Sequence, residues 1–89
     1  MQSLGEKFLK KANLQSESVP GIPLIELYGK SRIYMEYHKG IIQYTEHEIT
    51  IQSGLGSLRA EGEQLEISCI SEQYLVITGK IRQVRWEDE

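Results

Sequence analysis

The sequence is poor in the features on which disulfide-bonded, membrane-spanning and secreted proteins depend. Its only cysteine is Cys69, so no disulfide can form within the chain. No apolar run approaches the roughly 20 residues of a membrane-spanning helix, and residues 1–14 lack the apolar stretch, about 7 to 15 residues long, of a secretory signal. These absences predict a protein of a reducing compartment, and we expect it in the cytoplasm.

Residues that carry most catalytic and metal-binding chemistry are also scarce. The chain offers His38, His47, Cys69 and a single aspartate, Asp88, and the two histidines lack the clustered cysteine or carboxylate ligands of a zinc site. Residues 53–56 contain two glycines but neither the third glycine of a dinucleotide-binding loop nor the lysine of a phosphate-binding loop. We therefore expect no enzyme activity, no catalytic residue, no metal site and no cofactor.

The charge balance argues against a nucleic-acid-binding protein. The formal net charge is −3, and lysine and arginine form no basic stripe of the kind that neutralises phosphates. One alternative stays open, because aromatic side chains with basic neighbours on a sheet can stack the bases of a single strand. The residues concerned are Tyr28, Tyr34, Tyr37, Tyr44, Arg32 and Lys39.

From Ile22 to Trp86 the chain alternates apolar and polar residues in short runs. Such alternation is typical of half-buried strands, and turn signals every 8 to 12 residues are typical of an all-β meander, sandwich or barrel. The predicted strands are Leu24–Tyr28, Arg32–Tyr37, Ile41–Tyr44, Glu48–Gln52, Ser57–Ala60, Gln64–Ile70, Tyr74–Thr78 and Ile81–Trp86. The predicted turn glycines are Gly29, Gly40, Gly62 and Gly79.

Links this short join only antiparallel neighbours. We predict an all-β fold, an antiparallel meander of about eight short strands that forms a small sandwich or barrel-like domain. A similarity between residues 58–67 and 75–84, which are 17 residues apart, leaves a solenoid-like coil as an alternative. Ile81 and Val84 are three apart and can share one face of a strand only if a bulge lies near residues 82–83.

The same alternation predicts which side chains form the core. Ile33, Met35 and Tyr37 fall on one face of their strand. Cys69 alternates with Ile67, which predicts that it is a small core residue.

The first 21 residues differ from the rest. Apolar residues at helical spacing predict a short amphipathic helix, and the polar segment 15–21 that follows reads as a linker to a single β domain over residues 22–89. The apolar positions are Leu4, Phe8, Leu9 and Ala12, and the basic ones are Lys7, Lys10 and Lys11. About three turns of helix are marginal alone, so we expect docking on the β domain, on a partner or on an acidic membrane surface.

Four segments in a fixed order resemble the YabP/YqfC family of bacterial sporulation proteins. They are residues 22–29 and 33–41, followed by the paired "apolar-x-apolar-x-Gly" segments 58–67 and 75–81. Together they span nearly the whole chain. The His-Lys-Gly turn at residues 38–40 and the linker before Ile22 are more similar to the YqfC branch than to YabP.

The resemblance implies a small non-enzymatic protein of endospore-forming bacteria, made in the mother cell during spore development. The YqfC branch is associated with a membrane-bound sporulation partner, YqfD. The resemblance therefore implies a complex at the membrane that surrounds the forespore, where the basic N-terminal helix would contact anionic lipid. Where the branch typically has asparagine before the His-Lys-Gly turn, this chain has Tyr37, so no role of an amide carries over.

We interpret the protein as an adaptor that binds a protein partner through a sheet face or a free edge. The candidate partner-binding residues are Tyr34, Tyr37, His38 and Lys39. Residues 38–40 can instead simply close a hairpin, with Gly40 supplying an unusual backbone angle. The alternative function is a structural component of a spore layer, a homo-oligomer that assembles through sheet edges.

Overall fold

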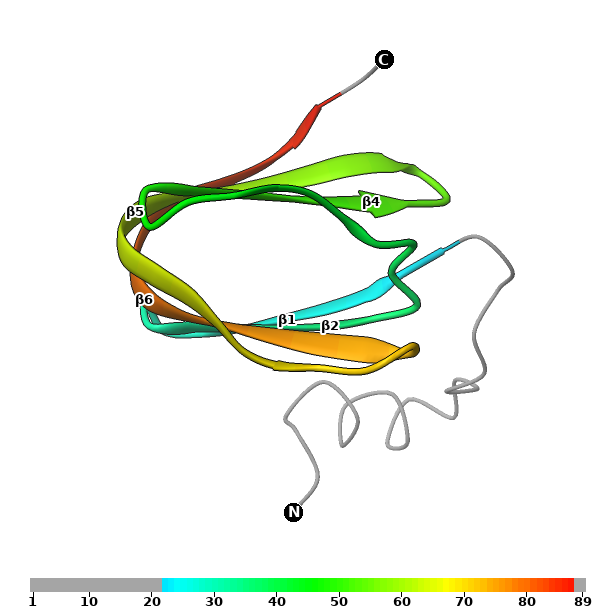
Figure 1. The fold of residues 1–89 in the computed structure, drawn as a ribbon, viewed down its shortest axis with the longest axis horizontal. Helices are drawn as coiled ribbons and strands as arrows, with labels where there is room; N and C mark the ends of the chain where they lie inside the picture. The colour runs from blue at the N-terminus through cyan, green and yellow to red at the C-terminus, as the bar shows by residue number, and fades with distance from the viewer. Residues whose placement is uncertain (1–21, 88–89) are drawn as a thin grey trace, which may run out of the picture.

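Six β-strands make up residues 22–87, the part of the chain that the computed structural model describes (Figure 1). The strands are β1 (Leu24–Tyr28), β2 (Arg32–Glu36), β3 (Ile41–Tyr44), β4 (Glu48–Ser53), β5 (Gly56–Ile70) and β6 (Tyr74–Glu87). The helix and linker predicted for residues 1–21, and Asp88, lie outside the described residues. Within residues 22–87 no helix is long and apolar enough to cross a membrane.

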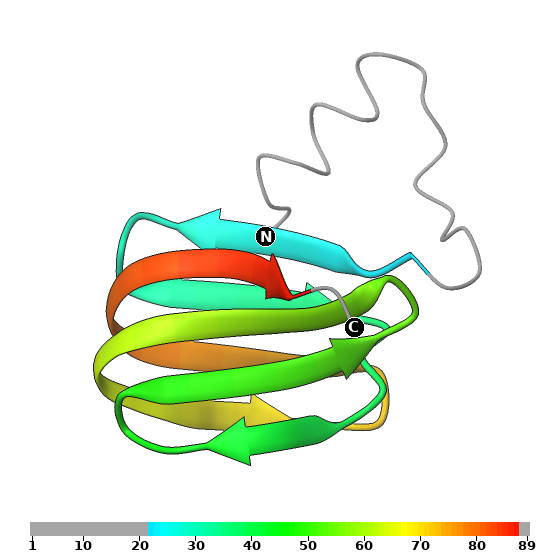
Figure 2. The same ribbon diagram turned by 90° about the horizontal axis from the view of Figure 1, so that it is seen from above.

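All six strands belong to one antiparallel sheet, in the order β1-β2-β6-β5-β4-β3. The prediction of an all-β fold with antiparallel neighbours is confirmed. The prediction of a continuous meander is wrong, because β2 pairs with β6 and not with β3. Residues 37–40 therefore carry the chain from one part of the sheet to another, and β1 and β3 lie at opposite edges (Figure 2).

β5 and β6 are long, and each takes up two of the predicted short strands. Gly62 and Gly79 lie inside these strands rather than at turns, which corrects the sequence prediction. A Cβ atom at Gly62 would collide with the carbonyl oxygen of Lys80, and one at Gly79 would lie 2.5 Å from that of Gln64. Glycine is present at both positions because the two backbones approach too closely for any side chain.

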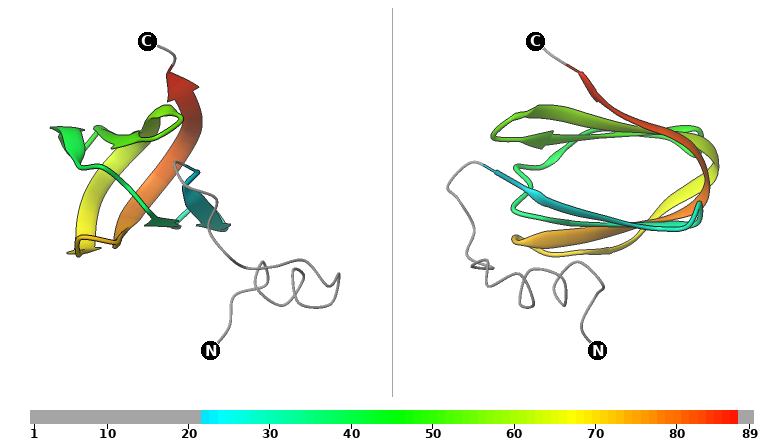
Figure 3. Two further views of the ribbon diagram at one scale, coloured as in Figure 1. Left: turned by 90° about the vertical axis from the view of Figure 1, so that its right-hand side faces the viewer. Right: turned by 180° about the vertical axis from the view of Figure 1, so that it is seen from behind.

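The β5–β6 pair bends where its register shifts, between Glu61 and Gly62 and between Glu63 and Glu66. The bend folds the sheet back on itself into two layers (Figures 1 and 3). We call them the β1–β2 layer, which also contains the start of β6 and the end of β5, and the β3–β4 layer, which contains the start of β5 and the end of β6. Both long strands thus belong to both layers.

The core lies between the two layers and is built by the inward-facing half of the alternating residues. The buried apolar residues are Ile33, Met35, Ile49, Ile51, Leu58, Ala60, Leu65, Leu75, Ile77 and Ile81. Ile81 is paired with Gly62 while Gln83 is paired with Glu61, so Arg82 is the extra residue of a bulge. The bulge predicted near residues 82–83 is confirmed, and it lets Val84 pack against the core as well.

Cys69 does not join the core, and its prediction as a core residue is wrong. A register shift between Ile67 and Cys69 places Cys69 opposite Val76, on the outer surface, where it is exposed. Ile67 before the shift still packs against the core. One bulge thus reverses the side on which the next residues of β5 lie.

Backbone hydrogen bonds tie neighbouring turns to the bend. In the β3–β4 turn the carbonyl oxygen of His47 accepts from the Gly62 N–H at 3.0 Å, and that of Glu46 accepts from the Leu65 N–H at 2.7 Å. In the β1–β2 turn the carbonyl oxygen of Lys30 accepts from the Ile81 N–H at 2.8 Å. These bonds satisfy backbone groups that the bulges remove from the regular ladder.

Candidate functional site

The β2–β3 connection, residues 37–40, holds three of the four predicted partner-binding residues and is clamped to the β1–β2 layer. The Tyr37 N–H donates to the carbonyl oxygen of Gln73 at 2.6 Å, and His38 Nε2 lies 2.8 Å from the carbonyl oxygen of Ser71. Gln73 and Ser71 belong to the β5–β6 turn. These hydrogen bonds hold the connection beside the β5–β6 turn, so the two loops form one surface.

The far end of the connection is clamped to the β3–β4 layer. The Lys39 N–H donates to the carbonyl oxygen of Gln52 at 2.7 Å, and the Gln52 N–H donates to that of Gly40 at 2.9 Å. Gly40 has a φ of 116°, a conformation open to glycine and strained for other residues. The alternative in which residues 38–40 close a hairpin is wrong, because the segment bridges two layers and does not join paired strands.

The His38 ring is occupied by bonds inside the connection. Its Nδ1 accepts from the Gly40 N–H at 3.1 Å, which leaves Nε2 to carry the proton and donate to the carbonyl oxygen of Ser71. A neutral imidazole meets both demands at once. His38 thus positions its neighbours, while the side chains of Tyr37 and Lys39 stay exposed.

Tyr37 stands out in this connection because its backbone has a φ of 64°. This left-handed conformation is uncommon for residues other than glycine, asparagine and aspartate, and it is strained for a bulky aromatic residue. Its side chain is 44% exposed, so the prediction that it joins Ile33 and Met35 in the core is wrong, and burial of the ring does not offset the strain. Strain of this kind, held in place by surrounding hydrogen bonds, is often found at functional positions.

Tyr34 belongs to a different surface, the outer side of the β1–β2 layer. Its ring lies 5.8 Å from that of Tyr74, centroid to centroid, and its hydroxyl donates to Glu36 Oε1 at 2.6 Å. Partial burial and the carboxylates of Glu36 and Glu26 raise the pKa of Tyr34 above its usual value, because both disfavour the phenolate. Tyr34 therefore stays protonated and donates.

We call this outer surface the tyrosine face. Its apolar and aromatic residues are Leu24, Tyr28, Tyr34, Tyr74, Val76 and Cys69, and Glu26, Arg32, Glu36, Glu66 and Thr78 lie on the same side. Tyr34 and Cys69 are each paired with Val76 from opposite sides, and Cys69 Sγ lies 3.5 Å from the Tyr74 hydroxyl. That contact is the first cause of a raised pKa at Tyr74. Sequence reasoning missed Tyr74, because only the β2–β6 pairing brings it beside Tyr34.

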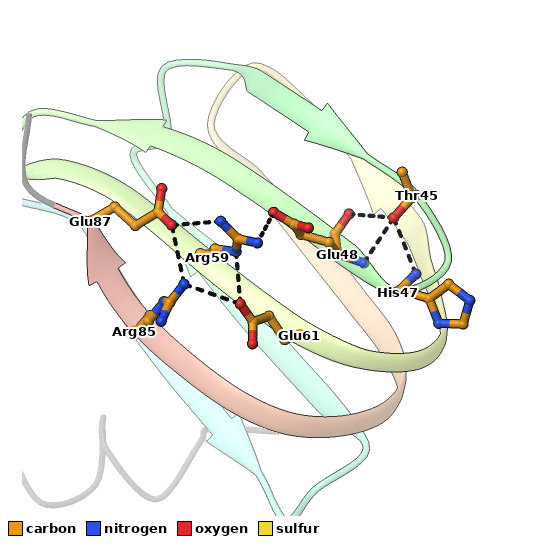
Figure 4. A network of polar contacts seen from close by, with 7 residues as sticks. All are labelled: Thr45, His47, Glu48, Arg59, Glu61, Arg85 and Glu87. Atoms are coloured by element: carbon orange, nitrogen blue, oxygen red, sulfur yellow. Dashed lines mark hydrogen bonds and ion pairs between the residues drawn. The ribbon is translucent and has the colours of Figure 1, made fainter.

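The outer side of the β3–β4 layer carries charged side chains that bind one another (Figure 4). Arg59 contacts Glu48, Glu61 Oε1 at 2.8 Å from its Nε, and Glu87 Oε1 at 2.8 Å from its Nη1. Arg85 contacts the same oxygens of Glu61 and Glu87 at 3.3 and 3.5 Å. The hydrogen bond to Glu87 and the surrounding carboxylates raise the pKa of Arg59.

This network also was not predicted, since its members are brought together by strand register rather than by sequence spacing. Its two guanidinium groups are matched to three carboxylates, so the charges satisfy one another and leave no cationic cradle for phosphate. We read it as a structural surface.

The remaining candidates for chemistry are scattered. His47 is exposed in the β3–β4 turn, where its Nε2 lies 3.2 Å from Glu46 Oε1. His38 lies in the β2–β3 connection and Cys69 on the tyrosine face. Among residues 22–87 no group of three or more histidine, cysteine, aspartate or glutamate side chains could hold a metal ion.

The four tyrosines considered for base stacking do not all lie on one surface. Tyr28 and Tyr34 lie with Arg32 on the outer side of the β1–β2 layer, whereas Tyr37 lies in the connection and Tyr44 on β3, at the opposite edge of the sheet from β1. The Tyr44 hydroxyl accepts from the Ile67 N–H at 2.8 Å, which ties it to β5. The single-strand alternative therefore does not extend to Tyr37 and Tyr44, and only Tyr28, Tyr34 and Arg32 share one side of the sheet.

The sequence model of the YabP family matches residues 23–89. This chain belongs to the YabP family. A Bacillus subtilis (strain 168) protein called "Uncharacterized protein YqfC" is 28% identical over 65 residues, which cover 73% of this chain and 70% of that protein. No solved structure matches.

The membership confirms the family that the sequence motifs indicated, and the structure explains the motifs in this YabP-family chain. The glycines of the paired apolar-x-apolar-x-Gly segments are Gly62 and Gly79, which the close approach of β5 and β6 requires. The His-Lys-Gly motif forms the bridge between the layers. The position before it has a left-handed φ, the backbone conformation that asparagine tolerates well and Tyr37 does not.

Proposed function

We propose that this YabP-family protein is a non-enzymatic adaptor of spore formation, acting in the mother cell of an endospore-forming bacterium. Its partner is a membrane-bound sporulation protein of the YqfD type, so it works in the cytoplasm and peripherally at the membrane around the forespore. The β2–β3 connection is the partner-binding surface, with Tyr37 as the anchor and Lys39 beside it. His38 keeps this segment in shape.

The observation that carries this proposal is an exposed tyrosine in a strained backbone conformation, on a segment clamped at both ends. Tyrosine is enriched among the residues that dominate binding energy, because a large rigid ring loses little entropy when it is buried. Binding residues commonly lie on connections that a rigid sheet positions. The four hydrogen bonds of residues 37, 39 and 40 and of the His38 ring to the two layers supply that rigidity.

A direct binding measurement tests the proposal. The full chain is titrated against the purified YqfD-type protein of the same organism in lipid nanodiscs. Tyr37→Asn removes the ring and suits the left-handed backbone, so it should weaken binding at least ~10-fold while leaving the fold intact. Tyr28→Thr is the matched control, because Tyr28 is 42% exposed and Tyr37 is 44% exposed. Equal binding by both variants and the unchanged chain would remove the connection from the interface.

A specific observation also favours self-assembly through an edge as a second candidate. All four residues of the edge strand β3 are exposed, including Ile41, Ile42 and Tyr44. An exposed apolar edge strand readily pairs with another chain. Light scattering over a wide concentration range tests it: assembly should grow with concentration and be abolished by Ile42→Lys, whereas a persistent monomer excludes it.

A further inference from the structure

The two outer surfaces of the folded sheet differ in kind. The β3–β4 layer shows solvent the Arg59 network, as expected of a sheet surface in contact with water. The tyrosine face has an apolar centre, where Tyr34, Tyr74 and Val76 are half-buried, and Glu26, Arg32 and Glu36 lie around it. Among residues 22–87 no further layer covers this face, because the other layer packs on its inner side. An apolar patch rimmed by charged residues on the outer side of an antiparallel sheet is typical of a surface that something covers.

The chain itself supplies a segment of suitable size. Residues 1–21 precede Ile22, and the chain enters the β1–β2 layer at Leu24, which belongs to the tyrosine face. A helix over residues 3–14 would be about 18 Å long. The four neighbouring strands of this layer span about 15–19 Å at their usual spacing. A linker of residues 15–21 reaches up to about 25 Å when extended, so the segment can lie across the face.

The charges are complementary. The segment carries Lys7, Lys10 and Lys11 against one acidic residue in positions 1–14. Glu26 and Glu36 lie on the outer side of β1 and β2, among the residues of the tyrosine face. On a helical wheel Lys7 and Lys11 lie along one side of the apolar stripe, beside Leu4, whereas Lys10 lies opposite to it. Docking the stripe on the tyrosines would bring Lys7 and Lys11, on one side of the helix, toward the carboxylates.

We propose that residues 3–14 dock as an amphipathic helix on the tyrosine face of their own chain. The helix buries Leu4, Phe8 and Ala12 against Tyr34, Tyr74 and Val76. It reserves this face for the chain itself and leaves the β2–β3 connection as the surface open to partners. The proposal is independent of the identity of any partner.

The native Cys69 makes the test direct, because it is exposed on the face in question. A second cysteine is placed in the full chain at Leu4→Cys, at Ala12→Cys or, as the matched control, at Lys10→Cys. The equilibrium of the intrachain disulfide with glutathione then gives the effective concentration of each thiol at Cys69. A loosely tethered segment gives a value of order millimolar at every position.

Docking predicts a higher effective concentration at Cys69 for the thiol at the end of the helix that lies nearer to it. The value for Leu4→Cys or Ala12→Cys should therefore exceed that for Lys10→Cys by at least ~10-fold. Adding Phe8→Asp to the variant with the higher effective concentration should lower that concentration to the millimolar value of a loosely tethered segment. Equal values at all three positions would overturn the proposal, as would an advantage that survives Phe8→Asp. Disulfides formed mainly between chains would overturn it as well, because the helix would then cover another molecule.

Discussion

Replacing Gly62 with alanine should destabilise this protein much more than replacing Gly29. Both substitutions add one methyl group at a glycine. At Gly29 a Cβ atom meets nothing within 4 Å, and the cost comes only from its φ of 56°. At Gly62 φ is not in the left-handed region, but the Cβ atom collides with the backbone carbonyl of Lys80 and lies 3.1 Å from Ile81 Cα.

The size of the difference follows from what must move. A left-handed alanine costs about 1 kcal/mol, which is the expected loss at Gly29. At Gly62 a strand must shift to make room for the methyl group. The shift strains two hydrogen bonds, from the Gly62 N–H to the carbonyl oxygen of His47 and from the Ile81 N–H to that of Lys30. Each bond contributes about 1 kcal/mol to stability. Partial exposure of the buried Ile81 adds about 1 kcal/mol more. We therefore expect a loss of about 3 kcal/mol.

Urea denaturation followed by far-UV circular dichroism and Trp86 fluorescence measures both losses. A domain of this size has a total stability of about 4–13 kcal/mol, so the Gly62 variant should lose a large part of it, with Tm about 12–24 °C lower. Gly79→Ala should cost at least as much, because its φ of 139° adds strain to a contact of 2.5 Å with Gln64. If Gly62→Ala cost no more than Gly29→Ala, the close approach of β5 and β6 would be refuted.

Three further predictions concern the surfaces. Tyr37→Asn should raise the free energy of unfolding by about 1 kcal/mol in urea titrations, because asparagine tolerates the φ of 64°; an unchanged value would show that the backbone there is not strained. Arg59→Ala should lower the urea midpoint in dilute buffer, and the loss should shrink in 1 M NaCl if its contacts with Glu48 and the other carboxylates act through charge. The pKa of Tyr34 is raised above 10.0 in the folded protein, so its contribution to stability is complete below pH 10 and is lost as the pH rises further. Unfolding measured at pH 8 and pH 11 should therefore show a smaller alkaline loss for Tyr34→Phe than for the unchanged chain, and equal losses would contradict the environment described for this hydroxyl.

Alternation predicted the strands well because each strand has one face in the core. β1 and β3 match their predicted ranges, and the bulge at Arg82 followed from the spacing of Ile81 and Val84. The same pattern could not reveal that Gly62 lies within a long strand, because a glycine that ends a strand and one that allows a close approach look alike in sequence. The exposed position of Cys69 could not be predicted, because the bulge between Ile67 and Cys69 leaves no break in the alternation of apolar and polar residues.

The surfaces were harder to predict than the strands. Tyr37, His38 and Lys39 are neighbours in sequence, so their shared segment was visible, but its role as a bridge depends on the pairing of β2 with β6. The contact of Tyr34 with Tyr74 and the Arg59 network are cross-strand features. Such contacts require the strand order and the register, which alternation alone does not determine.

The sharing of β5 and β6 by both layers has a consequence for folding cooperativity. A sandwich of two separate sheets can lose one sheet while the other persists, but here neither layer has a complete set of strands of its own. Opening one layer therefore disrupts β5 and β6, the same two strands that support the other layer. Amide protons at the centres of β2 and β4 should therefore exchange with solvent through the same global opening, with equal protection factors, as members of one foldon.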